Sequence, residues 1–297
     1  MIRTNVISIG DPFVLLHGDK YYMYATSADD GFLYWTSDDL KTWEKGGYCY
    51  KNPVWGYECY WAPEVFEVKG KFYMFYTARW KKNASLRIGV AVADKPEGPF
   101  VELKDEPLFD FGYAAIDATL FTDDDGKQYI YYSRDCSENV INGVHTSEIY
   151  VCEIAPDFKS LIGEPKKVTT PDCECEYLSG PEWRWNEGPF VIKHNGKFYM
   201  NYSMNCYGSK EYALGCAVSD SVFGEFKKYT HNPILSYRDC ANDFSGPGHN
   251  CIFTGKDGKL YTAFHIHTYA EAPSGDRKAV IARVTFNERD EMQIDLD

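Results

Sequence analysis

Apolar and polar residues alternate along this chain in short segments that are separated by turn residues. Residues 187–203 contain an apolar run from Phe190 to Ile192, an Asn195-Gly196 pair, and then several aromatic residues among polar ones. An Asn-Gly pair between two such runs is a strong signal for a two-residue hairpin turn. We therefore expect residues 187–203 to form a strand, a tight turn and a second strand.

The same pattern occurs five times. The copies begin at residues 11, 61, 117, 187 and 249, so the steps are 50, 56, 70 and 62 residues (61 − 11, 117 − 61, 187 − 117, 249 − 187). Each hairpin is followed by a further amphipathic strand, within residues 32–43, 86–94, 148–154, 212–219 and 279–286. Repeats of this length are typical of four-stranded propeller blades, and no stretch has the sustained 3.6-residue pattern of a helical solenoid.

The sequence therefore predicts an all-β fold, with residues 1–297 forming one five-bladed β-propeller. No Gly/Ser/Pro linker divides the chain. We expect the residues before Asp11 to complete the last blade and close the ring, because closure removes the exposed edges of an open sheet. In such a fold the first strand of every blade lines the central channel, so the starts of the five repeats converge on one funnel.

The residues at the starts of the five repeats have side chains that are suited to catalysis or to ligand binding. Asp117, Glu187, His249 and Trp61 each lie nine residues before the glycine of their hairpin turn (126 − 117, 196 − 187, 258 − 249, 70 − 61). Asp11 lies only seven residues before its own turn glycine (18 − 11), which predicts a slightly different depth for its carboxylate. Three carboxylates, an imidazole and an indole directed at one cavity are not what a packed core selects.

Each of these residues has an ordinary structural explanation when it is taken alone. Asp11 precedes a proline and is typical of a turn start, Asp117 would cap a turn, and Glu187 would lie in a solvated loop. His249 would be a core histidine with a satisfied hydrogen bond, and Trp61 would be a packing residue. Their occurrence at corresponding positions of one repeat favours a shared functional cavity.

Composition limits the partners. The net charge of −13 argues against binding to nucleic acid or to an anionic membrane surface. No apolar run reaches transmembrane length, and residues 1–10 hold no apolar signal region, so we expect a cytoplasmic protein or one whose export signal has been removed. The ten cysteines include no Cys-x-x-Cys pair, and Cys173 and Cys175 lie in an acidic loop that would be solvated or would bind a soft metal ion.

Several motifs together resemble glycoside hydrolase family 43, whose catalytic domains are five-bladed propellers. The resemblance covers nearly the whole chain. Its motifs are Asp11-Pro12, Trp61-Ala-Pro-Glu64, Ile116-Asp-Ala-Thr-Leu120, Glu187-Gly-Pro189, Gly248-His-Asn250 and the segment at residues 35–43.

The resemblance implies a role for each of these residues. Asp11 matches the general base, Glu187 the general acid, and Asp117 the carboxylate that positions the acid and raises its pKa. His249 matches a channel histidine that in many members faces a hydrated calcium ion. Arg283 matches a channel arginine that contacts the sugar.

Glycoside hydrolysis requires these roles on chemical grounds. One protonated carboxyl group donates to the leaving oxygen, and one carboxylate takes a proton from water. Asp117 would raise the pKa of Glu187 by like-charge repulsion. Family members of this type invert the anomeric centre, so we expect the Asp11 and Glu187 carboxyl groups about 6.5–9.5 Å apart, whereas a retaining pair lies about 5–5.5 Å apart.

Aromatic residues are candidates for the walls of the sugar site. Trp61 would offer a face to the C–H groups of the sugar, and Phe32 would form a wall of the innermost subsite. Trp183 and Trp185 directly precede the acid and would line an outer subsite, with packing as an equal alternative.

We therefore expect an exo-acting, inverting hydrolase that removes terminal β-D-xylose or α-L-arabinofuranose units from short hemicellulose- or arabinan-derived oligosaccharides. Many β-xylosidases of the family carry a C-terminal β-sandwich that closes the pocket, and we expect only the propeller in residues 1–297, so the choice between the two sugars stays open. A homo-oligomer would supply the missing wall. The alternatives are an endo-arabinanase of the same fold, a sugar-binding propeller without catalysis, and a scaffold for protein partners.

Overall fold

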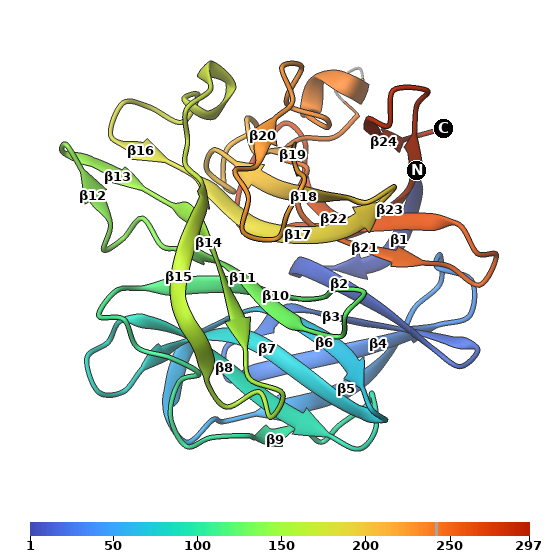
Figure 1. Cartoon of the computed structure of the whole chain (residues 1–297). Helices are drawn as coiled ribbons and strands as arrows, with labels where there is room; N and C mark the ends of the chain where they lie inside the picture. Colours follow the sequence, from blue (N-terminus) through green and yellow to red (C-terminus); the bar gives the residue numbers. More distant parts are fainter. Residues whose placement is uncertain (241–242) are drawn as a thin grey trace.

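The computed structural model describes residues 1–240 and 243–297, and their strands form five large sheets arranged around one centre (Figure 1). The first strands of neighbouring sheets contact one another in a ring, in the order β2, β6, β10, β17, β21 and back to β2. The fold is all-β, as the repeat predicted, and each sheet corresponds to one repeat.

Each blade is an antiparallel sheet whose strands follow the chain order from the channel outward. Blade 1 contains β2 (Gly10–His17), β3 (Lys20–Ala28), β4 (Gly31–Ser37) and β5 (Glu44–Lys51). Blade 2 contains β6 (Gly56–Val68), β7 (Lys71–Trp80), β8 (Leu86–Ala93) and β9 (Val101–Glu102). Blade 3 contains β10 (Ala115–Thr122), β11 (Gln128–Arg134), β14 (Glu148–Ile154) and β15 (Leu161–Thr169). Blade 4 contains β17 (Asn186–His194), β18 (Lys197–Met204), β19 (Ala213–Ser219) and β20 (Lys227–Lys228).

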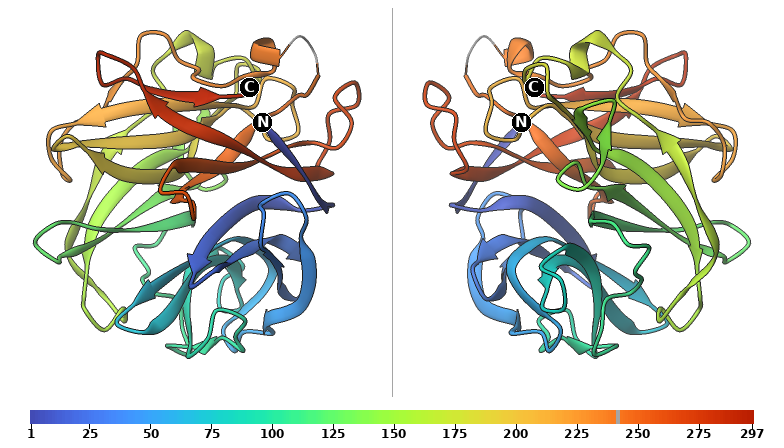
Figure 2. Two further views of the ribbon diagram at one scale, coloured as in Figure 1. Left: turned by 90° about the vertical axis from the view of Figure 1, so that its right-hand side faces the viewer. Right: turned by 90° about the vertical axis from the view of Figure 1, so that its left-hand side faces the viewer.

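The fifth blade joins the two ends of the chain. It contains β21 (Gly248–Thr254), β22 (Leu260–His267) and β23 (Arg277–Phe286), and both β1 (Ile2–Ile7) and β24 (Met292–Asp295) pair with β23. The termini lie side by side in all views (Figures 1 and 2), and the amino group of Met1 donates to the carbonyl oxygen of Leu296. The expected closure of the ring by the residues before Asp11 is confirmed, and the C-terminal strand adds to it.

The remaining elements lie between the blades. A small sheet of β12 (Val140–Ile141), β13 (Val144–Thr146) and β16 (Trp183–Arg184) lies beside blades 3 and 4, and the helical turns are η1 (Glu174–Glu176) and η2 (Tyr237–Cys240). Within the described residues, neither helical turn has the length or the apolar character needed to cross a membrane.

The hairpin predicted at residues 187–203 is confirmed. β17 and β18 are joined by Asn195 and Gly196, which have φ angles of 47° and 77°. Positive φ at both turn residues matches the twist of the flanking strands, and asparagine and glycine adopt it at low cost.

Every first strand carries a β-bulge at its start. One residue of each bulge has a positive φ, and these residues are Asp11 (54°), Ala62 (47°), Asp117 (56°), Gly188 (54°) and His249 (48°). The pairing register shifts at the same place in each blade. A bulge bends the strand and redirects its side chains, and bulges are common at barrel rims and beside active sites.

These bulges correct the register expected from the sequence. Asp11, Asp117 and His249 occupy the same bulge position, so Asp11 is not offset in depth. Glu187 instead precedes its bulge, as Trp61 does, and pairs with Ser203 where Trp61 pairs with Thr77. Counting from the turn glycines was misleading because the hairpin loops contain two residues in blades 1, 2 and 4 and five in blades 3 and 5.

Apolar side chains fill the channel beyond the bulges. Phe13 lies two residues past the blade 1 bulge, and its ring centroid is 5.1 Å from that of Phe66 and 6.4 Å from that of Phe190 in blade 4. All three strands belong to the inner ring. Aromatic rings therefore pack together below the bulges, and the residues that line the cavity lie at the end where the bulges are.

Candidate active site

A cavity of about 380 Å³ opens at that end of the channel. Asp11, Trp61, Asp117, Glu187 and His249 all line it, each delivered by the first strand of a different blade. The convergence that the repeat predicted is therefore present in the structure.

The Asp11 carboxylate is held by a cation and a hydroxyl group. Arg277 donates from Nη1 to Oδ1 at 2.9 Å, and Thr26 donates from Oγ1 to Oδ2 at 2.5 Å. Burial by itself would raise the pKa of Asp11, but the charge of Arg277 and then that of His249 lower it well below its usual range. Asp11 is therefore ionised at neutral pH and suited to accept a proton.

Glu187 has the opposite environment. Its Oε1 accepts a hydrogen bond of 2.7 Å from the hydroxyl group of Ser147, and no described lysine, arginine or histidine forms an ion pair with it. Burial raises the pKa of Glu187 well above its usual value, and the charges of Asp117 and Asp135 raise it further. These causes favour the protonated form of Glu187, which suits it to donate a proton.

Asp117 lies between these two groups. Its Oδ2 accepts the N–H of Gly188 at 3.1 Å and is 4.0 Å from Nδ1 of His249. Burial raises the pKa of Asp117 to about 6, with His249 opposing the rise and Asp11 adding to it. Because it binds the backbone beside Glu187, Asp117 both fixes the position of the acid and adds negative charge next to it.

The bulges are fixed to neighbouring blades through one repeated contact. The N–H of Ala62 donates to Thr26 Oγ1 at 2.9 Å, that of Asp117 to Thr77 Oγ1 at 3.1 Å, and that of His249 to Ser203 Oγ at 2.8 Å. These hydroxyl groups come from the second strand of the preceding blade. Polar side chains at this position thereby hold the channel residues in their positive-φ conformation.

A histidine replaces the hydroxyl group where blade 5 meets blade 1. The N–H of Asp11 donates to Nδ1 of His265 at 3.2 Å, and the His265 ring stacks on Tyr212 with centroids 5.5 Å apart. Burial lowers the pKa of His265 well below its usual value. A neutral imidazole with a free Nδ1 is what this hydrogen bond needs, so His265 positions the backbone of Asp11. The sequence analysis did not identify His265.

Arg283 is not the channel arginine, contrary to the expectation. It lies on β23 opposite Tyr261, near the hairpin end of blade 5, and does not line the cavity. Arg277 begins the same strand and pairs with His267 at the funnel end. β23 runs away from the funnel, so its first residue reaches Asp11 and the seventh lies about 20 Å further along the strand.

Phe32 is not a wall of the cavity either. Its side chain has no exposed surface and packs among Tyr50, Tyr60 and Tyr76 between blades 1 and 2. An alternating strand directs every second residue into the sheet-packing layer, and Phe32 occupies such a position. The expectation of a subsite wall at Phe32 was wrong.

The two tryptophans before the acid have different roles. Trp183 is stacked between His145, with ring centroids 4.1 Å apart, and Trp185, with centroids 5.8 Å apart. Trp183 therefore packs against two aromatic rings, and it does not line the cavity. Trp185 lines the cavity.

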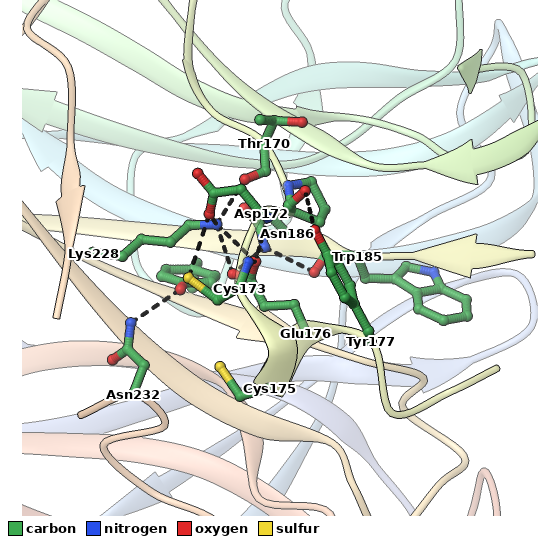
Figure 3. A network of polar contacts seen from close by, with 12 residues as sticks. Thr170, Asp172, Cys173, Cys175, Glu176, Tyr177, Trp185, Asn186, Lys228 and Asn232 are labelled. Carbon is green, nitrogen blue, oxygen red and sulfur yellow. Dashed lines mark hydrogen bonds and ion pairs between the residues drawn. The ribbon is translucent and has the colours of Figure 1, made fainter. Parts of the chain in front are cut away.

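A buried polar network supports the strand that carries the acid (Figure 3). Glu176 has no exposed surface, and its carboxylate accepts hydrogen bonds from Asn186 Nδ2 at 2.9 Å and from Lys228 Nζ at 2.8 Å. Lys228 also contacts Asp172 at 2.8 Å. Because Asn186 directly precedes Glu187, this network fixes the start of β17.

The same network contains the acidic loop at residues 171–177, which the sequence analysis considered for binding a soft metal ion. Asp172, Cys173 and Glu176 have ligand atoms within 4.8 Å of one another, a spacing that a metal ion would need. The ammonium group of Lys228 already supplies a positive charge to both carboxylates. The loop is therefore accounted for as a structural element around a buried ion pair.

For calcium near His249, oxygen atoms are the relevant donors. Asn250, next to His249, has a buried Oδ1 without a hydrogen-bond partner among the described residues. Oε2 of Glu64, on the first strand of blade 2, is also buried without such a partner. His249 Nδ1 itself faces Asp11 Oδ1 at 3.4 Å. Unpartnered oxygens of this kind fit water molecules around a hydrated cation.

Comparisons with known proteins agree with this geometry. The model of glycosyl hydrolases family 43 matches residues 4–292. The crystal structure of a thermostable family-43 glycoside hydrolase has a TM-score of 0.94 and 45% sequence identity, covering 99% of this chain and 96% of that one. A structure named endo-1,4-β-xylanase from Bacteroides thetaiotaomicron has a TM-score of 0.87 and 33% identity, covering 100% and 97% of the two chains.

Curated relatives carry several enzyme names. The β-D-galactofuranosidase xynD of Aspergillus niger is 28% identical over 95% of this chain and 81% of that enzyme. Other relatives are named β-xylosidase, in Xylanibacter ruminicola, and extracellular exo-α-(1→5)-L-arabinofuranosidase, in Streptomyces chartreusis. The matches to these two span 62% and 63% of their lengths.

Proposed function

The chain belongs to glycosyl hydrolase family 43, and within that family we propose that it is an exo-acting, inverting enzyme that removes terminal β-D-xylose or α-L-arabinofuranose units from short oligosaccharides. The observation that carries the proposal is that Asp11 and Glu187 line one cavity in opposite environments: Arg277 and Thr26 bind the Asp11 carboxylate, whereas burial and the charges of Asp117 and Asp135 raise the pKa of Glu187. This is the division of roles that acid–base hydrolysis of a glycosidic bond requires.

The reaction follows from these protonation states. The terminal sugar enters the cavity with its glycosidic oxygen beside Glu187, which donates its proton as the bond to the leaving group breaks. A water molecule on the opposite face of the ring gives a proton to Asp11 and attacks the anomeric carbon. The transition state resembles an oxocarbenium ion, which the negative charges of Asp11 and Asp117 stabilise. After product release, Glu187 regains a proton and Asp11 loses one to solvent.

Two features support these roles. Arg277 and Thr26 hold Asp11 in its ionised form, and the Ser147 hydroxyl group orients Glu187. The separation of about 6.5–9.5 Å between the Asp11 and Glu187 carboxyl groups stays a prediction. It follows from the proposed inverting mechanism, which needs room for a water molecule between Asp11 and the sugar. Proton NMR of the first-formed sugar tests it, since an inverting enzyme releases the anomer opposite to that of the substrate.

The substrate proposal rests on the size and walls of the cavity. A volume of about 380 Å³ is at the small end of ligand cavities, which suits a terminal unit more than a long chain. Trp61 and Trp185 offer apolar surface to a sugar ring.

An endo-acting enzyme, such as an endo-arabinanase, is the second candidate. A further cavity of about 560 Å³ adjoins the first and shares Trp61 and Arg277 with it. A longer chain could lie across Trp61 into this cavity. The products discriminate the two modes, because an exo-acting enzyme releases monosaccharide from the start and an endo-acting one releases longer fragments first.

The decisive experiment is a substrate screen. We expect turnover of p-nitrophenyl β-D-xylopyranoside or p-nitrophenyl α-L-arabinofuranoside, and the β-D-galactofuranoside belongs in the screen because of the Aspergillus niger relative. Xylo- and arabino-oligosaccharides of defined linkage then identify the natural bond. Absence of hydrolysis of all pentosides, with the protein folded, would contradict the proposal and favour a sugar-binding role.

We also propose that a hydrated calcium ion lies near His249, with Asn250 and Glu64 contacting its water molecules. When bound, it would supply positive charge at the base of the acidic funnel. Removal of the ion by a chelator is expected to lower kcat about tenfold, and calcium is expected to restore it. Unchanged activity after chelation would leave His249 as a residue that interacts only with Asp11 and Asp117.

A further inference from the structure

Besides Asp11, Asp117 and Glu187, two further acidic residues line the catalytic cavity, the exposed Glu138 and Asp135. Of these two, Asp135 is buried. It directly follows β11, only 6% of its surface is exposed, and it comes from the second strand of blade 3, whereas Asp11, Asp117 and Glu187 come from first strands. The proton transfers proposed above do not use it. A buried carboxylate in an active-site cavity costs solvation free energy, so its presence there needs an explanation.

Asp135 lies next to the acid. A carboxylate oxygen of Asp135, the sulfur of Cys136 and a carboxylate oxygen of Glu187 all lie within 4.8 Å of one another. No described lysine, arginine or histidine forms an ion pair with Asp135. Its hydrogen-bond donors are neutral, namely the N–H of Ser137 at 3.0 Å, the Ser137 hydroxyl group and the Cys136 thiol at 3.8 Å.

The other charged groups are arranged unevenly around Glu187. Asp117 faces it from β10 and Asp11 from β2, and the guanidinium group of Arg277 is paired with Asp11. Nδ1 of His249 lies 4.0 Å from Asp117 and opposes the rise of the Asp117 pKa. Asp135 has no such neighbour among the ion pairs of the described residues.

Building on the proposed function, we propose that Asp135 is a positioning residue for the proton of Glu187. Its negative charge, held 4.8 Å or less from the acid by Ser137, makes ionisation of Glu187 unfavourable. The acid thus lies between two carboxylates, Asp117 on the side of Gly188 and Asp135 on the side of Cys136.

The two neighbouring carboxylates act on Glu187 in the same direction. Burial already disfavours ionisation of Glu187, and the charges of Asp117 and then of Asp135 oppose it further, which raises the pKa of Glu187. The pH above which Glu187 loses its proton is therefore set in part by both neighbours.

The competing explanation is that Asp135 only shapes the turn after β11. Its Oδ1 accepts the N–H of the residue two positions on, as Asp257 Oδ1 does with Lys259 at 3.1 Å in an exposed turn. The variant Asp135→Asn separates the two explanations, because its amide oxygen can still accept from Ser137 while the charge is gone.

The test is the pH dependence of kcat/KM, which reports the ionisations of the free enzyme. In Asp135→Asn, the alkaline limb, which follows Glu187, is expected to move to lower pH by about one unit, with the acidic limb unchanged. Asp135→Glu keeps the charge and should keep the alkaline limb near its wild-type position. Ser137→Ala removes a hydrogen bond without removing the charge, and Asp257→Asn makes the matched substitution far from the cavity, so neither should shift the limb downward.

The outcomes are distinguishable. Superimposable pH profiles of Asp135→Asn and wild type would overturn the inference, and so would a raised KM without a shift, which would make Asp135 a sugar contact. Should Asp135→Asn not fold, Asp135→Ser removes the same charge and is measured instead. If the wild type hydrolyses no pentoside or Glu187→Gln is fully active, the proposed function itself fails. If those two controls behave as expected and only the shift is missing, the inference about Asp135 alone fails.

Discussion

Replacing Glu187 with glutamine is expected to lower kcat/KM on oligosaccharides by about 10³-fold. The amide has nearly the same shape and can still accept the Ser147 hydrogen bond, but it has no proton to give to the leaving oxygen. The sugar alkoxide would then have to leave without protonation. The loss should therefore lie in kcat, with KM little changed.

The leaving group provides a sharper readout. A 2,4-dinitrophenyl glycoside departs as a stable anion and needs little help from an acid, so Glu187→Gln should retain most of the wild-type rate on it. Glu182→Gln is the matched control, because Glu182 is exposed and lies five residues earlier. An equal loss on both kinds of substrate would show that Glu187 has another role.

The loss of wild-type activity at high pH is also expected to follow the ionisation of Glu187. Activity needs Glu187 protonated, and the pKa of Glu187 is raised by burial and by Asp117 and Asp135, so activity should persist above the pH at which an exposed glutamate ionises. At the acidic end, activity needs Asp11 ionised, and Arg277 lowers the pKa of Asp11. The two shifts have opposite signs and widen the active range on both sides.

The sequence predicted the blades well because each one repeats a local signal. Asn195-Gly196 specifies a tight turn by its own backbone preferences, and the spacing of five such hairpins specifies the ring. The convergence of Asp11, Asp117, Glu187 and His249 followed from that repetition alone. At these positions the repeated sequence pattern was sufficient to place the residues in the channel, without knowledge of how the blades pack.

What the sequence could not supply depends on the bulges and on strand direction. The bulge positions were hidden because the hairpin loops differ in length, so a count from the turn glycines placed Asp11 wrongly. The sequence analysis assigns the channel arginine to Arg283, inside the strand expected at residues 279–286, whereas Arg277 lies just before that range at the funnel end of β23. Phe32 was misassigned because a strand residue can face a cavity or a neighbouring sheet, and only packing decides.

Asp135 and His265 illustrate a further limit. Both come from the ends of second strands, where the repeat predicts packing positions and carries no catalytic motif. A signal was nevertheless present, because His265 occupies the position that is Thr26, Thr77, Ser133 and Ser203 in the other blades. An imidazole among four hydroxyl residues marks a site where the backbone contact has a special partner, and that partner is Asp11.

Replacing Asp11 is expected to lower kcat as much as replacing Glu187 does, but the loss should not depend on the leaving group of the substrate. Asp11 has a φ of 54°, which asparagine and glycine adopt at lower cost than most other residues, so Asp11→Asn and Asp11→Gly are the variants of choice. Without the carboxylate, water is not deprotonated as it attacks, and kcat is expected to fall about 10³-fold. The loss should be as large on the dinitrophenyl glycoside as on oligosaccharides, because a better leaving group does not activate water.

Azide then tests both the role of Asp11 and the stereochemistry. It is a stronger nucleophile than water and needs no base, and Asp11→Gly leaves room for it beside Arg277. Azide should therefore raise the rate at which Asp11→Gly cleaves the dinitrophenyl glycoside and yield a glycosyl azide of inverted configuration. The rate of Glu187→Gln should not rise with azide. A glycosyl azide of retained configuration would instead place a covalent intermediate on another residue and contradict the inverting mechanism. In the proposed mechanism the sugar lies between Asp11 and Glu187. Azide should therefore restore activity only when the base on the Asp11 face is missing, and not when the acid on the Glu187 face is missing.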